Sequence, residues 1–412
     1  MEFRHAQRLG AHIGILSLFF ALSSASTSQA CTTAAWSAEA SASHAPVIWK
    51  NRDTDSTRNR VVFVDEKPYK YVGLTDNSNS TGRMVYAGLN ERGFAIFNSV
   101  AYNVPAAQGD ELKDLEGAIM ADALRTSSSV ADFESYLKRN LGPDLGAQAN
   151  FIVYDASGDV WLYEVHNHGF EKFSVNAAPQ KYLVNTNYSR SGKAEKGSGY
   201  LRFDRATQLI EQHKGLADLE FILNGLSRDF RHTLLKAPSL DDLAKTSVKT
   251  PEWYASVDTI DRESTAAAVV IEGKVPGKTH STASFWVMLG EPVSSLAVPI
   301  WVESGRIPAA LSQGTTVAIQ QQSLEIKGKL RPGVESEKLK YINLSLLQNK
   351  EGTGILPILM RTQKQIIDST RAFLSQKHSA EEMADFQDKM ANLALDVLRK
   401  INQASSTSAL KS

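Results

Sequence analysis

The sequence predicts an α+β protein with layered, mostly antiparallel sheets and a helical region added at the C-terminus. Two observations carry this prediction: blocks of strand-like runs alternate with pairs of helical stretches, and the apolar spacing becomes strongly helical towards the end of the chain. The 412 residues are 42% hydrophobic, which suffices for one large core or two smaller ones. Basic and acidic residues both number 45, so no charge excess indicates a nucleic acid or an anionic membrane as partner.

Strand-like runs dominate residues 31–101. They are rich in apolar residues and are separated by polar, Gly and Pro residues, which is typical of antiparallel strands. The predicted strands cover 31–38, 46–53, 61–64, 69–74, 84–89 and 94–101. We expect them to form one antiparallel sheet.

Two helical stretches follow, and then strands and helices alternate again. Apolar residues at helical spacing predict a helix over 111–126, and Ser129 with Asp132 gives a capping-box start for a helix over 129–140. Turn residues at 155–159 predict a hairpin. The other predicted elements are strands at 150–154, 160–165, 182–187, 266–271 and 283–289, and helices at 201–214 and 217–226.

The C-terminal third has a different pattern. After residue 302 the strand signals end, and 355–376 and 380–404 are strongly helical. We interpret these two segments as a helical hairpin that packs on the sheet core or on a partner chain, and a homo-oligomer is left open. The predicted organisation is a signal peptide at 1–30, a main domain at 31–305 and a largely helical extension at 306–412.

The first thirty residues have the three regions of a secretory signal peptide. Arg4 and Arg8 precede an apolar run over 13–22, and small or polar residues lead to Ala30. The run is shorter than the about 20 residues that span a bilayer, and no later stretch is long enough. We therefore expect an exported protein, periplasmic or secreted, without a transmembrane anchor.

Cys31, the only cysteine, directly follows the best cleavage site. Cysteines of exported proteins usually come in even numbers as disulfides, so a lone cysteine at a cut site favours a functional thiol over a leftover one. A rival cut after Ala25 would leave 26–30 in front of Cys31 and would require further trimming or self-cleavage. A lipoprotein signal would need an apolar residue where Ser28 stands.

A cysteine at the start of a chain is chemically useful. A thiol attacks a carbonyl as the thiolate, and a free cysteine with a pKa near 8.5 is only a few per cent ionised at neutral pH. An α-amino group, with a pKa of about 7.7–8.0, can take that proton and return it. One residue then supplies both nucleophile and base, and the chemistry needs no catalytic histidine.

Polar motifs at four further places accompany Cys31. They are Lys50-Asn51-Arg52-Asp53, Asn90-Glu91-Arg92-Gly93 with the later Asn98, Thr186-Asn187, and Arg202-Phe203-Asp204-Arg205. In these motifs, over residues 31–300, the chain resembles the N-terminal-nucleophile hydrolases, in particular the branch of choloylglycine hydrolases, penicillin V acylases and isopenicillin N acyltransferase. The resemblance implies a four-layer αββα sandwich and an amide-cleaving or acyl-transferring activity without metal or cofactor.

The resemblance also implies roles for the site residues. Asp53 would bind and orient the α-amino group, Asn98 and Asn187 would donate to the oxyanion, and Arg202 would keep the thiolate charged. Taken without the family, Asp53 could instead cap a turn. Asn98 would then be only a polar residue that interrupts an apolar strand and needs a hydrogen-bond partner.

Three assignments stay open. Asn185 could exchange roles with Asn187, and Arg205 could be a surface salt-bridge partner. Choloylglycine hydrolases carry Arg directly before their Asn-x-Asp motif, whereas this chain has Lys50 there and Arg52 inside the motif. Which cation accompanies the thiol is therefore undecided.

Other chemistries have weaker support. His166 and His168 stand two residues apart and would face the same side of one strand, but no further His or Cys completes a metal site, so we expect a solvent-exposed pair. No papain-like signature, phosphate loop, dinucleotide fingerprint or Gly-x-Ser-x-Gly motif occurs.

We expect an exported, cofactor-free amide hydrolase or acyltransferase that acts on a small acyl amide. The alternative is a catalytically inactive, exported ligand-binding protein with the same fold.

Overall fold

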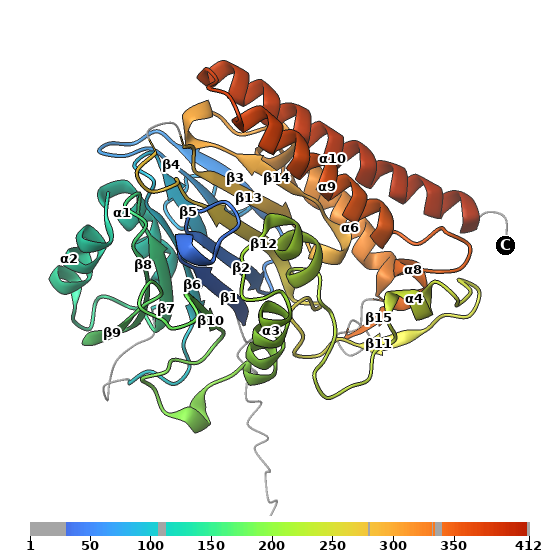
Figure 1. Ribbon diagram of the computed structural model, residues 1–412, viewed down its shortest axis with the longest axis horizontal. Helices are drawn as coiled ribbons and strands as arrows, with labels where there is room; N and C mark the ends of the chain where they lie inside the picture. Colours follow the sequence, from blue (N-terminus) through green and yellow to red (C-terminus); the bar gives the residue numbers. More distant parts are fainter. Residues whose placement is uncertain (1–29, 106–112, 279–280, 332, 334–339, 410–412) are drawn as a thin grey trace, which may run out of the picture.

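The computed structural model describes residues 30–105, 113–278, 281–331, 333 and 340–409, so the predicted signal peptide lies outside the described residues except for Ala30. Two antiparallel sheets pack face to face (Figure 1). One has seven strands in chain order, β3 (Asn59–Val64), β4 (Tyr71–Asp76), β5 (Ala87–Asn90), β6 (Ala95–Val100), β7 (Ala149–Tyr154), β8 (Val160–His166) and β9 (Gly169–Ser174). The other has six strands in the order β10 (Tyr182–Asn185), β1 (Cys31–Trp36), β2 (Val47–Asp53), β12 (Thr265–Glu272), β13 (Ser284–Leu289) and β14 (Ala297–Ile300).

The expectation of a single sheet from residues 31–101 is wrong. Strands β1 and β2 belong to the six-stranded sheet, and β3 to β6 belong to the seven-stranded one. Every residue of β1 and β2 is buried, because both faces of these strands are covered. Local patterning does not reveal which partner strand a doubly covered strand will find, since burial on both faces removes the apolar–polar alternation that marks a core-facing side.

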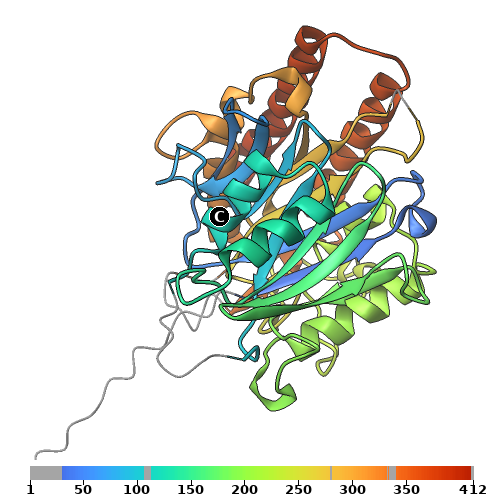
Figure 2. The same cartoon turned by 90° about the vertical axis from the view of Figure 1, so that its left-hand side faces the viewer.

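Helices α1 (Glu116–Thr126) and α2 (Val130–Asn140) cover the outer face of the seven-stranded sheet and lie in front of it in Figure 2. The predicted capping box is confirmed, since Ser129 and Asp132 bond each other's backbone N–H groups. Phe133 of α2 packs against Phe151 and Tyr163 with ring centroids 5.9 and 5.4 Å apart. The first predicted helix, 111–126, begins at Glu116, because residues 113–115 are not helical and Asp114 has a left-handed φ of 49°. Residues 111–112 lie outside the described residues.

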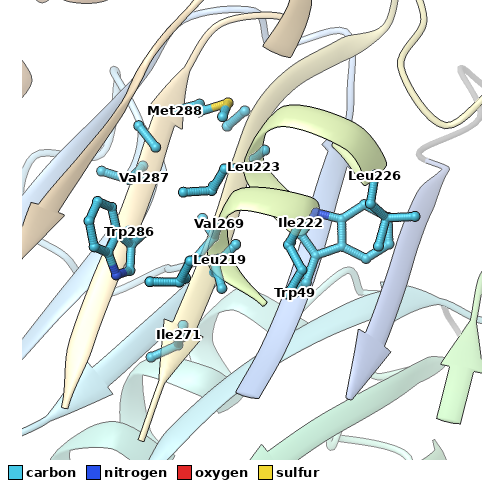
Figure 3. Packing of buried hydrophobic residues seen from close by; sticks show 14 of the residues in the cluster. Trp49, Leu219, Ile222, Leu223, Leu226, Val269, Ile271, Trp286, Val287 and Met288 are labelled. Atoms are coloured by element: carbon cyan, nitrogen blue, oxygen red, sulfur yellow. The ribbon is translucent and has the colours of Figure 1, made fainter. Parts of the chain in front are cut away.

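The outer face of the six-stranded sheet is covered by α3 (Tyr200–Gln212) and by a π-helical turn, η3 (Phe221–Leu226). Figure 3 shows Ile222, Leu223 and Leu226 of this turn against Trp49 and Val269 of the sheet. Burying each such side chain contributes about 1.5–3 kcal/mol. The layers are thus helix, sheet, sheet and helix, which confirms the predicted αββα architecture.

The C-terminal helices pack on the sheet core, the first of the two predicted alternatives. Helices α6 (Ala318–Leu330), α9 (Leu356–Leu374) and α10 (Ala380–Ala409) share the main apolar cluster with the sheets, and α9 and α10 run side by side in Figure 1. Gln363 of α9 bonds both backbone groups of Ala297 on the edge strand β14, which covers that exposed edge. None of the described helices is long and apolar enough to cross a membrane.

Short elements complete the described chain. The extension also contributes β15 (Tyr341–Asn343), which pairs with β11 (Trp253–Ala255) from the main part of the chain. The remaining helices are α4 (Leu240–Leu243), α5 (Ala309–Ser312) and α8 (Leu344–Leu347), and single 3₁₀ turns lie at Ala38–Ala40, Ala194–Lys196, Pro292–Ser294 and Val302–Ser304. None of these short elements was predicted from the sequence.

Candidate active site

Cys31 is the first residue of β1 and pairs with Arg52 of the neighbouring strand β2. Its exposed fraction is 5%. Opposed residues of an antiparallel pair share a face, as do residues two apart along a strand, so Cys31, Lys50 and Arg52 point to the same side. That side faces the seven-stranded sheet, because the Lys50 ammonium reaches Asn98 of β6.

Asn187 and Arg202 hold the backbone of Cys31 from both sides. The backbone nitrogen of Cys31 donates to Asn187 Oδ1 at 2.8 Å. Arg202 donates from Nη1 to the Cys31 carbonyl at 2.6 Å and from Nη2 to the same Asn187 Oδ1 at 2.9 Å. A fully buried guanidinium therefore fixes the Cys31 carbonyl and the amide that binds the Cys31 nitrogen.

Gly199 makes room for this guanidinium. It precedes α3 with a left-handed φ of 83°, and a Cβ built on it would lie 2.4 Å from Arg202 Nη2. Thr186 Oγ1 also bonds the Gly199 carbonyl at 3.1 Å. A side chain at position 199 would thus displace Arg202 from Cys31.

Lys50 is the cation whose charge interacts with the Cys31 thiol. Its Nζ donates to Asn98 Oδ1 at 2.9 Å and to the Tyr86 carbonyl at 3.0 Å. Burial lowers the pKa of Lys50 and the charge of Arg52 acts in the same direction, while the charges of Cys31 and Asp53 oppose them, and the resulting pKa is about 8. The ammonium is thus held close to its titration point at neutral pH.

Arg52, the alternative cation, is committed elsewhere. It donates to Asn59 Oδ1 at 2.8 Å, forms an ion pair with Asp76 at 3.1 Å, and lies 3.8 Å from the ring centre of Tyr86. Arg202 bonds the Cys31 carbonyl, and the charges of Lys50 and Cys31 interact. Arg52 lies on the same face as Cys31, but its guanidinium is bonded to other residues.

Asn98 offers a donor towards the site. Its Oδ1 accepts from Lys50, and within the described part of the chain its Nδ2 has no acceptor at hydrogen-bonding distance. Asn187 differs, because its Oδ1 faces Cys31 and its Nδ2 donates to the Val100 carbonyl at 3.0 Å. The two amides are thus held differently: Asn98 bonds Lys50 through its oxygen, whereas Asn187 binds the Cys31 nitrogen.

Asp53 ends β2 and is almost wholly buried. Its Oδ1 accepts from Thr265 Oγ1 at 2.8 Å and its Oδ2 from Arg262 Nε at 2.8 Å. Burial raises the pKa of Asp53, and the charges of Arg262 and Arg202 act against that rise. The structure thus brings Asp53 within the electrostatic reach of Arg202, the residue that contacts Cys31.

The residues left open by the sequence have separate partners. Asn185 accepts from Arg190 Nη1 at 2.7 Å and donates to the Thr186 carbonyl at 3.1 Å, while Asn187 is the one that contacts Cys31. Arg205 forms an ion pair with Asp229 at 2.6 Å.

Contrary to expectation, the two histidines do not lie on the same side of one strand. His166 ends β8, whereas His168 lies in the turn that follows it. His166 is half-buried and only His168 is exposed. Among the described residues no group of three or more His, Cys, Asp or Glu side chains could hold a metal ion.

Sequence reasoning missed Arg262, Thr265 and Asp258. Arg262 and Thr265 bond Asp53 from more than 200 positions away in the sequence. Asp258 accepts from Arg202 Nε at 2.8 Å. The only local signal was a cluster of charged residues, 258–263, directly before the predicted strand at 266–271.

Comparisons with known proteins give matches in structure alone. No family model and no curated protein matches the chain. Among solved structures, a Caenorhabditis elegans N-acylethanolamine-hydrolyzing acid amidase ortholog matches with a TM-score of 0.40 and 15% identity, covering 61% of this chain and 95% of that one. The R18L variant of a conjugated bile acid hydrolase from Clostridium perfringens matches with a TM-score of 0.35 and 13% identity, covering 69% and 95%.

A penicillin V acylase from Agrobacterium tumefaciens also matches, with a TM-score of 0.33 and 13% identity over 66% of this chain and 86% of that one. Bile acid hydrolases and penicillin V acylases are groups that the sequence motifs resemble. At these TM-scores and identities, the likeness assigns neither an activity nor a substrate to this chain.

Proposed function

We propose that this chain is an exported cysteine amidase or acyltransferase of the N-terminal-nucleophile class, active once residues 1–30 have been removed. The observation that carries the proposal is the hydrogen bond from the Cys31 nitrogen to Asn187 Oδ1, with Arg202 on the Cys31 carbonyl. Cleavage of the 30–31 peptide bond would turn this nitrogen into an α-amino group that is already bound beside the thiol. A general base must be held within reach of the proton that it takes, and the bond to Asn187 would hold this nitrogen in the buried site.

The reaction follows from this geometry. The α-amino group of Cys31 takes the Sγ proton, and the thiolate attacks the carbonyl carbon of an acyl amide. The tetrahedral oxyanion accepts from Asn98 Nδ2, and the ammonium returns its proton to the leaving amine as the C–N bond breaks. Water then hydrolyses the thioester, or a second amine takes the acyl group.

Lys50 stabilises the negative charge that forms on Sγ. It lies on the same face of the sheet as Cys31, and its contact with Asn98 links the cation to the oxyanion donor. A cation in a buried site stabilises a thiolate more strongly than an exposed one does, because little water screens the interaction. This assigns Lys50 the place that Arg holds in choloylglycine hydrolases.

The test is acyl-enzyme trapping across a panel of small acyl amides. Protein that begins at Cys31 is mixed with each amide, quenched in acid within seconds and digested. The mass of the peptide that carries Cys31 is then measured by mass spectrometry. We expect one acyl group on this peptide with accepted substrates, and none in Cys31→Ala. If no amide acylates Cys31 and iodoacetamide alkylates it no faster than free cysteine, the chain is an inactive ligand-binding protein instead.

A further inference from the structure

Two arginines surround the Cys31 site without belonging to its reacting atoms. Arg202 bonds Cys31 and Asn187, and Arg262 bonds the Asp53 carboxylate. Their side chains are 0% and 13% exposed. Two guanidinium groups at low exposure repel each other, and neighbouring carboxylates offset this repulsion.

Asp53 is one such carboxylate, since it bonds Arg262 directly and the charge of Arg202 acts on it. Asp258 is a second, and it contacts both arginines. Its Oδ1 accepts from Arg202 Nε at 2.8 Å and lies 3.8 Å from Arg262 Nη1. One carboxylate oxygen thus connects the arginine on the nucleophile to the arginine on Asp53. The contacts form a continuous series from Cys31 through Arg202, Asp258 and Arg262 to Asp53.

The backbone around Asp258 is shaped for this contact. Asp258 has a left-handed φ of 53°, which is unfavourable for most residues with a Cβ and least so for Asp and Asn. Thr259 Oγ1 bonds the carbonyls of Ser256 and Asp261 at 3.0 and 2.7 Å and so ties this turn together. Backbone strain maintained by side-chain bonds is common where a side chain must be held in one place.

We infer that Asp258 is a positioning residue that balances the charges of Arg202 and Arg262 and thereby keeps Arg202 on the Cys31 carbonyl and Arg262 on the Asp53 carboxylate. The inference rests on the proposed function. It assigns Asp258 no contact with substrate, since it acts through the two arginines. Its side chain is 30% exposed, so water reaches the carboxylate from one side.

The test replaces the carboxylate by an amide of the same shape. Asp258→Asn keeps an oxygen that can accept from Arg202 Nε and keeps a residue type that tolerates the left-handed backbone, but it removes the negative charge. We expect kcat to fall about 10-fold to 100-fold, since bonds to charged groups are worth this much, with KM changed by less than about threefold. Steady-state kinetics on the amide that best acylates the wild-type enzyme measure both.

A matched control separates positioning from a general loss of charge. Asp388 lies on the distant helix α10, where it forms an ion pair with Arg306. Its side chain is 32% exposed, close to the value for Asp258. Asp388→Asn should leave kcat and KM unchanged. Urea unfolding of both variants should show that each is folded at the temperature of the assay.

A double-mutant cycle tests the path through Arg262. If Arg262 is replaced by an uncharged residue, the negative charge of Asp258 has one arginine fewer to offset, so its removal should lower kcat less. The kcat of the double variant Asp258→Asn, Arg262→Gln should therefore be about fivefold or more above the value expected if the two single fold-losses multiplied. If Asp258→Asn did not fold, Arg262→Lys is the second variant: it keeps the positive charge but lacks the planar guanidinium with its several N–H donors, and it should lower kcat about tenfold.

Two outcomes overturn the inference: a folded Asp258→Asn enzyme with the kcat of the wild type, or purely multiplicative effects in the cycle. Neither touches the proposed function, which stands or falls with acylation of Cys31 in the wild-type enzyme.

Discussion

The protein contains two buried clusters of charged residues that are adjacent in the sequence: Arg262 belongs to the first and Asp261 to the second. The first surrounds Cys31 and contains Lys50, Asp53 and Arg202. The second joins the C-terminal extension to the sheets, since Arg331 at the end of α6 bonds both carboxylate oxygens of Glu291. Both clusters are almost wholly buried, and both shift the pKa values of their members.

The two clusters differ in how their groups are satisfied. Burial raises the pKa of Asp261 well above its usual range, and the charge of Glu291 adds to the rise, while Arg331 and Lys327 outweigh burial and lower the pKa of Glu291. Glu291 and Arg331 neutralise each other, and Asp261 Oδ1 has no hydrogen-bond partner among the described residues. Around Cys31, by contrast, stand a thiol and an amide donor, Asn98 Nδ2, that has no acceptor among the described residues. Burial and shifted pKa values alone therefore do not mark an active site.

In the cluster around Cys31, substituting the nucleophile itself should give the largest loss of amide turnover. Cys31→Ala removes the attacking atom, so amide turnover should fall by about 10⁴-fold or more, down to the detection limit. The free energy of unfolding should change by about 1 kcal/mol or less, because the side chain is small. Turnover assays and urea unfolding on the same preparation measure both, and a variant that keeps turnover would place the chemistry elsewhere.

Substituting Glu291 should give the opposite result. Glu291→Gln leaves the buried Arg331 guanidinium without its charge partner, which should cost about 3–5 kcal/mol of unfolding free energy. The kcat of the molecules that remain folded should stay within about threefold of the wild type, since Glu291 touches no group at Cys31. A selective loss of kcat at unchanged stability would mean that the two clusters act as one.

Substituting Asn98 tests the oxyanion donor. Asn98→Ala should lower kcat by about 10²- to 10³-fold with little change in KM, because the donor acts on the tetrahedral oxygen. Asn98→Asp is a second variant that keeps the size and removes the N–H donors, and it should be at least as slow. Steady-state kinetics check both, and a kcat within a factor of two of the wild type would exclude Asn98 from the oxyanion site.

The smallest predicted effect concerns pH. Lys50 has a pKa of about 8, so it is cationic below that pH and neutral above it. The thiolate therefore loses its neighbouring charge as pH rises through about 8, and kcat/KM should fall on the alkaline side. Lys50→Arg stays charged throughout and should remove this alkaline limb. A profile from pH 6 to 10 in which both enzymes decline alike would show that another group controls it.

The sequence was sufficient for the architecture and for the residues that local motifs mark. Cys31 stood out through its cut site, and Asn187 and Arg202 through short motifs that the structure brings to Cys31. Helix α2 was predictable because its capping box and apolar spacing are local signals.

Other features depended on contacts between distant segments. Arg262 meets Asp53 only because β12 pairs with β2 in the six-stranded sheet, and no periodicity in either segment encodes that pairing. The choice between Lys50 and Arg52 likewise needed the partners of each, since both point to the same face of one strand.

The central claim is that the α-amino group of Cys31 is the base, and blocking that group tests it most directly. Two proteins are prepared, one that begins at Cys31 and one that keeps Ala30 in front of it as an amide. We predict that the first forms the acyl-enzyme and turns over amides, whereas the second is slower by at least about 10²-fold, the usual contribution of a positioned base. Equal turnover by the two proteins would contradict the account.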